Sequence, residues 1–367
     1  MIIKGLKYEN FRNLKDNHII PSEKMNVIIG DNGQGKTNLL ESMWMFNGVR
    51  SFRGSKDKDL IAFGKNSAKI EIDFFSEERL QNARLEFING KRDAYINDIK
   101  KPAPSHLMGK ITSIVFSPDH LSLIKDGPNI RRKFIDSAIC QVKPQYSVYL
   151  ARYTKVLNQR NALLKDISYY SELADTLEIW DKELAVNGSI IISERLKYIS
   201  EMSLFASEYH SGISENREKL ELLYKNKYTP QTSVQEIAED FMKTLINVKN
   251  DDLQLKYTTK GPHRDDIEIK INGKNSRQYA SQGQQRSAVL SLKLAEATLV
   301  DQITGQQPVI LLDDVLSELD KARQNFLLNK IKDRQVFITC CDYLAKDIMK
   351  FGKLFTVKDG KVIENNI

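Results

Sequence analysis

Residues 26–42 read Asn26-Val-Ile-Ile-Gly-Asp-Asn-Gly-Gln-Gly-Lys-Thr-Asn-Leu-Leu-Glu-Ser42, and this stretch decides the fold. Its β-branched start, residues 27–29, is typical of a buried strand. The glycines that follow predict a loop, and the run from Asn38 to Phe46 predicts a helix. A strand, a glycine-rich loop and a helix in this order indicate the start of an α/β domain.

Within this stretch, the spacing Gly30-x-x-x-x-Gly35-Lys36-Thr37 matches the phosphate-binding loop pattern. Glycines let the backbone curl so that N–H groups point inward at a triphosphate, and the next helix presents its positive end to the same anion. We expect Lys36 to neutralise the β and γ phosphates and the Thr37 hydroxyl to ligate Mg²⁺. The residues predicted to contact ATP here are Gly30, Asn32, Gly33, Gln34, Gly35, Lys36, Thr37 and Asn38.

The composition is ordinary for a soluble protein, with 41% hydrophobic and 28% charged residues in a chain of 367. This length favours two domains over one compact core. The net charge of +7 fits a nucleic-acid partner, although many basic proteins bind nothing anionic. Cys140, Cys340 and Cys341 show no metal or disulfide spacing, and neither a signal peptide nor a membrane-spanning run is visible. We therefore expect a cytoplasmic protein that does not enter a membrane.

Strand signals fill both ends of the chain, and helix signals fill its middle. Alternating apolar residues in 70–87 and the turn signal Asn89-Gly90 predict an antiparallel β layer after the first helix. Helical spacing dominates from about residue 120 to 250, and strand signals resume at 253–258. The predicted architecture is an α/β head built from residues 1–118 and 253–367, with an all-helical lobe, 119–252, inserted into it.

A second apolar strand, residues 309–312, runs into the carboxylates Asp313 and Asp314. P-loop ATPases place a Mg²⁺ contact at the end of such a strand, so we assign Asp313 to the metal and Asp314 to orienting the attacking water. Two acids that merely cap the following turn are the structural alternative.

The segment beginning at Ser281 predicts a third polar element. Ser281 and Gln284 have the spacing of a capping box at a helix start. Backbone N–H groups and a hydroxyl at a helix start can bind an anion, so Ser281, Gly283 and Gln284 are candidate phosphate contacts. This second anion site has no use within a solitary P-loop domain.

At this point the chain resembles a known superfamily. The segment at Ser281 lies where ABC-type ATPases carry their signature motif, which contacts the γ-phosphate held by a second subunit. The order of motifs and the long insertion resemble the chromosome-maintenance branch of that superfamily. More closely, six blocks resemble the RecF family of bacterial recombination-mediator ATPases: Tyr8-Glu-Asn-Phe-Arg-Asn-Leu14, Gly30-Asp-Asn-Gly-Gln-Gly-Lys-Thr-Asn38, Phe116-Ser-Pro-Asp119, Gly261-Pro-His-Arg-Asp-Asp266, Ser281-Gln-Gly-Gln-Gln-Arg286 and Leu311-Leu-Asp-Asp-Val-Leu-Ser-Glu-Leu-Asp320.

The resemblance implies an ABC-type ATPase head, an ATP-dependent homodimer and weak, DNA-stimulated ATP hydrolysis in DNA repair, replication and the SOS response. It implies binding to single- or double-stranded DNA at gaps or junctions and recombinase loading through partner mediator proteins. Two departures stand out. Asp314 replaces the glutamate usual in transporter-type relatives, which fits a slow switch, and no switch histidine follows Thr339-Cys-Cys-Asp342. Thr339 or Asp342 is then the candidate γ-phosphate sensor.

Several residues keep two interpretations. Arg12 and Arg53 resemble arginines near the nucleotide, or they are exposed turn residues. Lys125 and the run Arg131, Arg132, Lys133 fit phosphate contacts or one solvated helix face. His263 is either a functional residue of its block or a turn-stabilising side chain.

Three functions remain open: a DNA-bound switch ATPase, a nucleotide-gated clamp without significant hydrolysis, and the motor subunit of a transporter. The β layer, the missing histidine and the large insertion disfavour the third.

Overall fold

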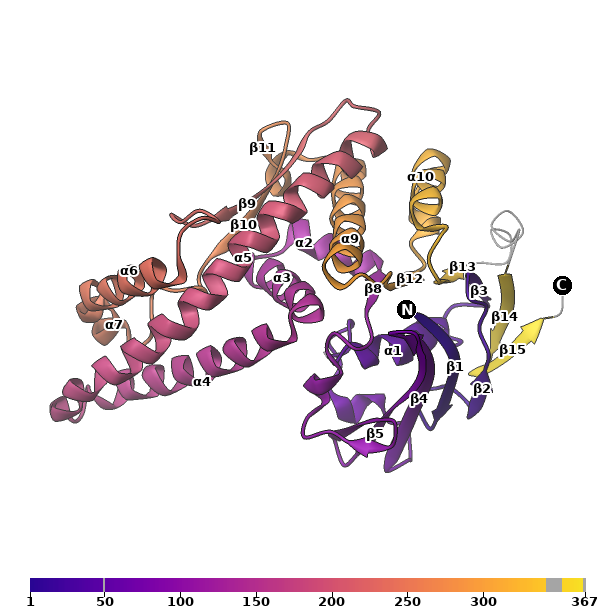
Figure 1. The fold of residues 1–367 in the computed structure, drawn as a ribbon, viewed down its shortest axis with the longest axis horizontal. Helices are drawn as coiled ribbons and strands as arrows, with labels where there is room; N and C mark the ends of the chain where they lie inside the picture. The colour runs from indigo at the N-terminus through magenta and orange to yellow at the C-terminus, as the bar shows by residue number, and fades with distance from the viewer. Residues whose placement is uncertain (49, 341–351, 366–367) are drawn as a thin grey trace. The chain divides into compact units, whose positions relative to one another are not determined.

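The computed structural model describes residues 1–48, 50–340 and 352–365, and the chain forms two compact units (Figure 1). Unit 1 contains Met1–Ser122, Phe205–Lys219 and Ser281–Ile367, and unit 2 contains Leu123–Leu204 and Leu220–Ala280. None of the helices in the described ranges combines the length and apolar character that crossing a membrane requires.

The central sheet of unit 1 has the strand order β15-β14-β3-β13-β12-β8. All neighbours are parallel except the edge pair β15 and β14, which is antiparallel. Every residue of β12 and β13 is buried, as expected for parallel strands covered on both faces. The strand bounds are β3 Met25–Ile29, β8 Ser113–Phe116, β12 Val309–Asp313, β13 Val336–Cys340, β14 Gly352–Lys358 and β15 Lys361–Asn365.

Helices α1 (Lys36–Trp44), α9 (Gln282–Thr304) and α10 (Lys321–Ile331) belong to the same unit. Helix α1 contacts β8, β12 and β13, so the phosphate-loop helix lies over the middle of this sheet. Because parallel strands end at the same edge, the loop after β3 and the acids after β12 come together there.

The predicted antiparallel layer is present as a second sheet, ordered β2-β1-β4-β5-β6-β7. Its strands are β1 Ile2–Glu9, β2 Asn17–Ile19, β4 Ser67–Ser76, β5 Arg79–Ile88, β6 Lys91–Ile96 and β7 Ile99–Lys100. The predicted turn joins β5 to β6, and Asn89 and Gly90 both have positive φ, as a type I′ hairpin requires. The buried face of this sheet shares one apolar core with α1 and the central sheet, including Phe46, Phe87 and Val115.

Unit 2 is mainly helical, with α3 (Pro128–Val142), α4 (Pro144–Asp166), the first part of α5 (Leu177–Ile213), α6 (Val234–Asn247) and α7 (Lys249–Leu255). The short helices α2 (Ser122–Lys125) and α8 (Ser276–Tyr279) lie at its ends. Segment 167–176 joins α4 to α5 (Figure 1). Tyr146 and Tyr153 of α4 are buried in the core of this unit.

Unit 2 also corrects two expectations. It contains a three-stranded antiparallel sheet of β9 (Leu220–Lys225), β10 (Asp266–Ile271) and β11 (Lys274–Asn275), so the insertion is not wholly helical. The pairing of β10 with β9 keeps residues 253–280 in unit 2, whereas the sequence placed them in the head. Residues 253–255 are helical and not a strand, because α7 continues to Leu255 and ends at Lys256 in the left-handed conformation.

Candidate nucleotide-binding site

The loop between β3 and α1 needs glycine at two positions for steric reasons. Gly30 has φ +147°, and a Cβ there would lie 2.3 Å from the carbonyl oxygen of Val357. Gly35 has φ +118°, and its Cβ would lie 2.9 Å from Oδ1 of Asn13. A side chain at Gly30 would displace β14 and one at Gly35 would displace the turn before β2, so the packing around the loop requires glycine at both positions.

A buried lysine and a threonine follow this loop, and the threonine contacts a carboxylate at the end of β12. Lys36 is only 4% exposed, and its ammonium donates to the carbonyl oxygen of Gly30 at 2.6 Å. The Thr37 hydroxyl donates to a carboxylate oxygen of Asp313 at 2.8 Å, across 276 residues of sequence. The structure thus brings together the two residues that the sequence assigned to Mg²⁺.

Asp313 sits in a largely buried position at the end of β12. Burial raises its pKa, while the hydrogen bond from Thr37 acts in the opposite direction. The Thr339 hydroxyl, from the end of β13, lies 3.1 Å from the same carboxylate oxygen. One hydroxyl and one carboxylate fit Mg²⁺, which keeps several waters and takes its other ligands from phosphates. Within the described ranges, no group of three or more His, Cys, Asp and Glu side chains could hold a metal by itself.

Asp314 has a left-handed backbone conformation, with φ +53°. Non-glycine residues adopt this region at a cost, and such residues cluster at functional sites. Its N–H donates to the Thr339 hydroxyl at 2.8 Å, which fixes the turn. Thr339, one of the two candidate sensors, therefore touches both acids, whereas Asp342 lies outside the described residues.

A cavity of about 290 Å³ opens in front of the loop. Gly30 and Gln34 are not among its lining residues, and Gln34 instead accepts a hydrogen bond from the N–H of Asp359. Arg53 lines the cavity and donates to the side-chain oxygen of Asn38 at 3.0 Å, so it lies nearer the predicted phosphates than Arg12 does. The lining residues are Asp31, Asn32, Gly33, Gly35, Lys36, Thr37, Asn38, Arg53 and Asp314.

Arg12 has a different environment from the one expected. Its guanidinium donates to both carboxylate oxygens of Glu41, at 2.8 and 2.9 Å, and to the Ser55 hydroxyl at 2.6 Å. Glu41 lies on α1 and is completely buried. The guanidinium is thus neither a solvated turn residue nor part of the cavity lining. It compensates a buried charge on the phosphate-loop helix.

Asn13 is a residue that the sequence did not single out. Its side-chain NH₂ donates to the carbonyl oxygen of Gly33 at 3.0 Å, and its oxygen accepts from the Asn38 amide at 2.7 Å. It therefore ties the loop to the start of α1. The one sequence signal for Asn13 was its membership of the motif at residues 8–14. Contacts that brace a loop arise from tertiary structure, so no local pattern predicts them.

The start of α9 has the predicted capping box. The Ser281 hydroxyl accepts from the N–H of Gln284 at 3.3 Å, and the Ser281 N–H donates to the Gln284 side-chain oxygen at 2.9 Å. At Gly283 a Cβ would have ordinary contacts, with Arg323 at 3.6 Å, so glycine is not required there by the fold of this unit.

The capping glutamine is held by the segment between α5 and β9, a connection that the sequence did not predict. The Gln284 side-chain NH₂ donates to a carboxylate oxygen of Glu218 at 2.8 Å. The other oxygen of Glu218 lies 3.0 Å from Nε2 of His210, which is fully buried on α5. Burial lowers the pKa of His210, although Glu218 opposes that shift.

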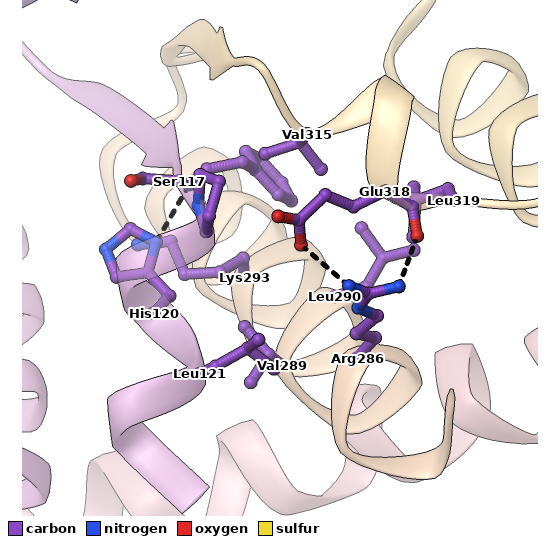
Figure 2. Close-up of a pocket in the computed structure, with 12 residues that line it drawn as sticks. Ser117, His120, Leu121, Arg286, Val289, Leu290, Lys293, Val315, Glu318 and Leu319 are labelled. Carbon is purple, nitrogen blue, oxygen red and sulfur yellow. Dashed lines mark hydrogen bonds and ion pairs between the residues drawn. The ribbon is translucent and has the colours of Figure 1, made fainter. Parts of the chain in front are cut away.

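Helix α9 is also joined to the turn that follows the acid pair (Figure 2). Arg286 donates to the carbonyl oxygen of Glu318 at 2.9 Å, and its guanidinium lies 3.4 Å from the Glu318 carboxylate. A small apolar cavity lies beside this contact, and the end of β8 with the segment after it, including Ser117, His120 and Leu121, lines its other side (Figure 2). The signature-like segment and the acid turn are therefore bonded within one chain.

Two of the four basic residues in question, Arg131 and Arg132 of α3, bind acidic segments of the same unit, whereas Lys125 and Lys133 are exposed and keep both interpretations. Arg131 is buried and donates to both carboxylate oxygens of Asp266, at 2.9 and 3.1 Å. Arg132 donates to the carbonyl oxygen of Asp265 at 2.6 Å. Both arginines hold β10 against α3, so neither the DNA-contact nor the solvated-face interpretation applies to them.

The site combines a phosphate loop after a buried strand, two acids at the end of another strand and a separate capped helix. These features define the head of an ABC-type ATPase of the SMC kind. The family model described as RecF/RecN/SMC N terminal domain matches residues 2–362. The chain belongs to the RecF family. It is 42% identical to the DNA replication and repair protein RecF of Agathobacter rectalis, over 99% of both chains. It is 40% identical to the protein of the same name from Clostridium tetani, over 100% of both.

Solved structures agree with this assignment. The recombination mediator protein RecF-ATPrS of the RecFOR pathway superposes with a TM-score of 0.92 at 36% identity, covering 99% of this chain and 98% of that one. The Smc head domain of Pyrococcus furiosus, bound to the C-terminal domain of ScpA, gives 0.58 at 18% identity, covering 100% of this chain and 96% of that one. The second likeness shows the fold alone.

Proposed function

We propose that this chain is a DNA-bound switch ATPase of recombinational repair and replication-fork maintenance. Mg-ATP drives its homodimerisation on DNA, slow hydrolysis resets it, and the dimer assists recombinase loading at gaps or junctions through mediator partners. The RecF structures similar to this chain are named with ATP or ATPrS and with the RecFOR pathway, which supports the nucleotide and the partners.

The contact between Thr37 and Asp313 carries the nucleotide part of this proposal. A hydroxyl and a carboxylate from distant elements meet beside a buried lysine, which is the arrangement that phosphoryl-transfer sites use. Bound Mg²⁺ would supply charge neutralisation at the phosphate oxygens. Lys36 would bind phosphate, Thr37 and Asp313 would hold the ion, and the Asp314 carboxylate would accept a hydrogen bond from the attacking water.

The homodimer is supported by the capped start of α9. The phosphate loop already supplies a lysine and backbone donors for one triphosphate, so the Ser281 segment needs an anion from elsewhere. A two-fold symmetric pairing gives each ATP a loop from one copy and the Ser281 segment of the other. The γ-phosphate would then be part of the interface, and ADP would not hold it.

The second candidate is a nucleotide-gated clamp that hydrolyses ATP negligibly. The short side chain of Asp314 favours it, because an aspartate reaches less far toward a water than a glutamate does. ATP hydrolysis with and without DNA, in wild type and Asp314→Asn, separates the two. We expect slow, DNA-stimulated turnover that the variant lowers by about 10² or more, with ATP still bound. Wild-type turnover no faster than the variant's would establish the clamp instead.

A further inference from the structure

One surface loop of unit 2 is held by several buried polar contacts. Residues 256–264, here called the basic loop, connect α7 to β10. Arg160 on α4 is fully buried, and its guanidinium donates to Asp252 at 2.6 Å and to the Thr258 hydroxyl at 2.9 Å. The N–H of Thr258 also donates to the side-chain oxygen of Asn161 at 2.8 Å. The start of the loop is thus fixed to α4.

The second half of the basic loop is fixed as well. His263 lies 2.6 Å from the Tyr153 hydroxyl through Nδ1 and 3.1 Å from the carbonyl oxygen of Thr258 through Nε2. Gly261 has φ +130°, and a Cβ there would lie 2.6 Å from the Tyr153 hydroxyl and 2.8 Å from Phe241. The loop therefore has one conformation that its own sequence and α4 enforce. His263 stabilises this turn, which is one of the two roles that the sequence allowed for it.

The exposed side chains of the basic loop are three cations and one aromatic ring: Lys256, Tyr257, Lys260 and Arg264. None of the three cations makes an ion pair with any residue that the structure describes. The Arg264 guanidinium stacks over the Tyr257 ring at 4.9 Å. The Lys256 ammonium lies 5.8 Å from the ring of Tyr169, which is 80% exposed in the segment that follows α4.

The buried ion pairs of Arg160 are weak evidence that these contacts serve stability. Loops that a rigid scaffold positions commonly carry the residues that bind ligands. A loop fixed in this way, with unpaired cations and exposed rings, is preorganised for a ligand that has both phosphates and unpaired bases. Tyrosine and arginine are also frequent at protein–protein interfaces, but lysine is depleted there and is a common phosphate contact, so Lys256 and Lys260 favour a polyanion.

We propose that the basic loop and Tyr169 bind single-stranded nucleic acid, with phosphates on Lys256 and Lys260 and bases stacked on Tyr257 and Tyr169. The proposal rests on the DNA binding proposed above. It adds which surface binds and that the bound nucleic acid is single-stranded.

The test compares variants by fluorescence anisotropy with labelled oligothymidylate and with a labelled hairpin duplex. Tyr257→Ala with Tyr169→Ala should weaken oligothymidylate binding by roughly 5- to 150-fold per stacked base and leave duplex affinity near wild type. Tyr257→Phe should keep the affinity that this position supplies, because stacking needs the ring and not the hydroxyl. The matched control is Tyr279→Ala, since Tyr279 is 69% exposed in the same unit.

A salt titration tests the phosphate contacts separately. Lys256→Ala with Lys260→Ala should lower the slope of log affinity against log salt by about 1.4, because each single-strand phosphate that a lysine no longer neutralises reduces it by about 0.7. Lys197→Ala, which removes an exposed lysine from α5 in the same unit, should leave the slope unchanged.

The outcomes separate this inference from the function it rests on. Wild type that binds no nucleic acid overturns both. Wild type that binds, with loop variants that match their controls, overturns the loop assignment and leaves the proposed function standing. An equal loss on duplex and single strand refutes the stacking. Unchanged thermal unfolding and ATP binding confirm that each variant is folded.

Discussion

Removing the guanidinium of Arg12 should destabilise unit 1 and should not remove an ATP contact. Glu41 is completely buried on α1, and Arg12 donates to both of its carboxylate oxygens. Ser51 also donates to Glu41, but a hydroxyl brings no compensating charge. Deleting one partner of a buried pair costs about 3–5 kcal/mol, because the other charge stays buried without its counter-charge.

Arg12→Ala should therefore lower the free energy of unfolding by about 3–5 kcal/mol. Arg12→Lys keeps a charge but loses the two-pronged contact, so it should cost about 1.5–3 kcal/mol, the worth of one charge-assisted bond. Arg12→Ala combined with Glu41→Gln should be more stable than Arg12→Ala alone, because the buried charge is gone. Urea unfolding in a Trp180→Phe background leaves Trp44, which ends α1, as the one tryptophan, so its fluorescence measures all three variants in unit 1.

One pair of measurements would refute this structural role of Arg12. If Arg12→Ala lost less than about 1 kcal/mol, within the range of an exposed ion pair, while its ATP affinity collapsed, the guanidinium would belong to the nucleotide site. The family resemblance would then have been the better guide.

Three further predictions concern the nucleotide and the dimer. Lys36→Ala should weaken ATP binding by roughly 10- to 150-fold in isothermal titration, the worth of a hydrogen bond to a charged group, and wild-type affinity would exclude the phosphate-loop assignment. Ser281→Arg should prevent sedimentation as a dimer with a slowly hydrolysed ATP analogue while each monomer still binds it, and normal dimers would disprove the role of the α9 start. Burial raises the pKa of Asp313, so the folded protein takes up this proton at higher pH than the unfolded chain does. As pH falls from neutral toward about 4, the contribution of Asp313 should increase stability while Mg-ATP affinity decreases, and Asp313→Asn should remove both trends.

The sequence predicted best where the signal is local. The phosphate loop is contiguous, and the acids directly follow a short apolar strand, so parallel topology alone brings Thr37 and Asp313 together. The sequence did not predict side chains that are paired over long distances. Arg12 was assigned to the nucleotide or to an exposed turn, and Arg131 to phosphate contacts or a solvated helix face, because no sequence pattern marks Glu41 or Asp266 as their partners.

The same limit explains the errors in the insertion. Strand β9 has six residues and gains its stability from β10, far along the chain, so helical signals around it dominated the prediction. Residues 253–258 have strand-like composition, yet Arg160 binds both Asp252 and Thr258 and holds this stretch as a helix end followed by a loop.

The division of the chain into units also sets an order for its synthesis on the ribosome. Every residue of unit 2 has been translated once residue 280 is made. In unit 1, β3 is made early, but its neighbours β13 and β14 lie in 336–358. Domains fold as units while the chain emerges, so unit 2 can fold first. The phosphate-loop strand must wait for almost the last residues, and throughout that delay the nascent head has an unpaired apolar strand for chaperones to cover.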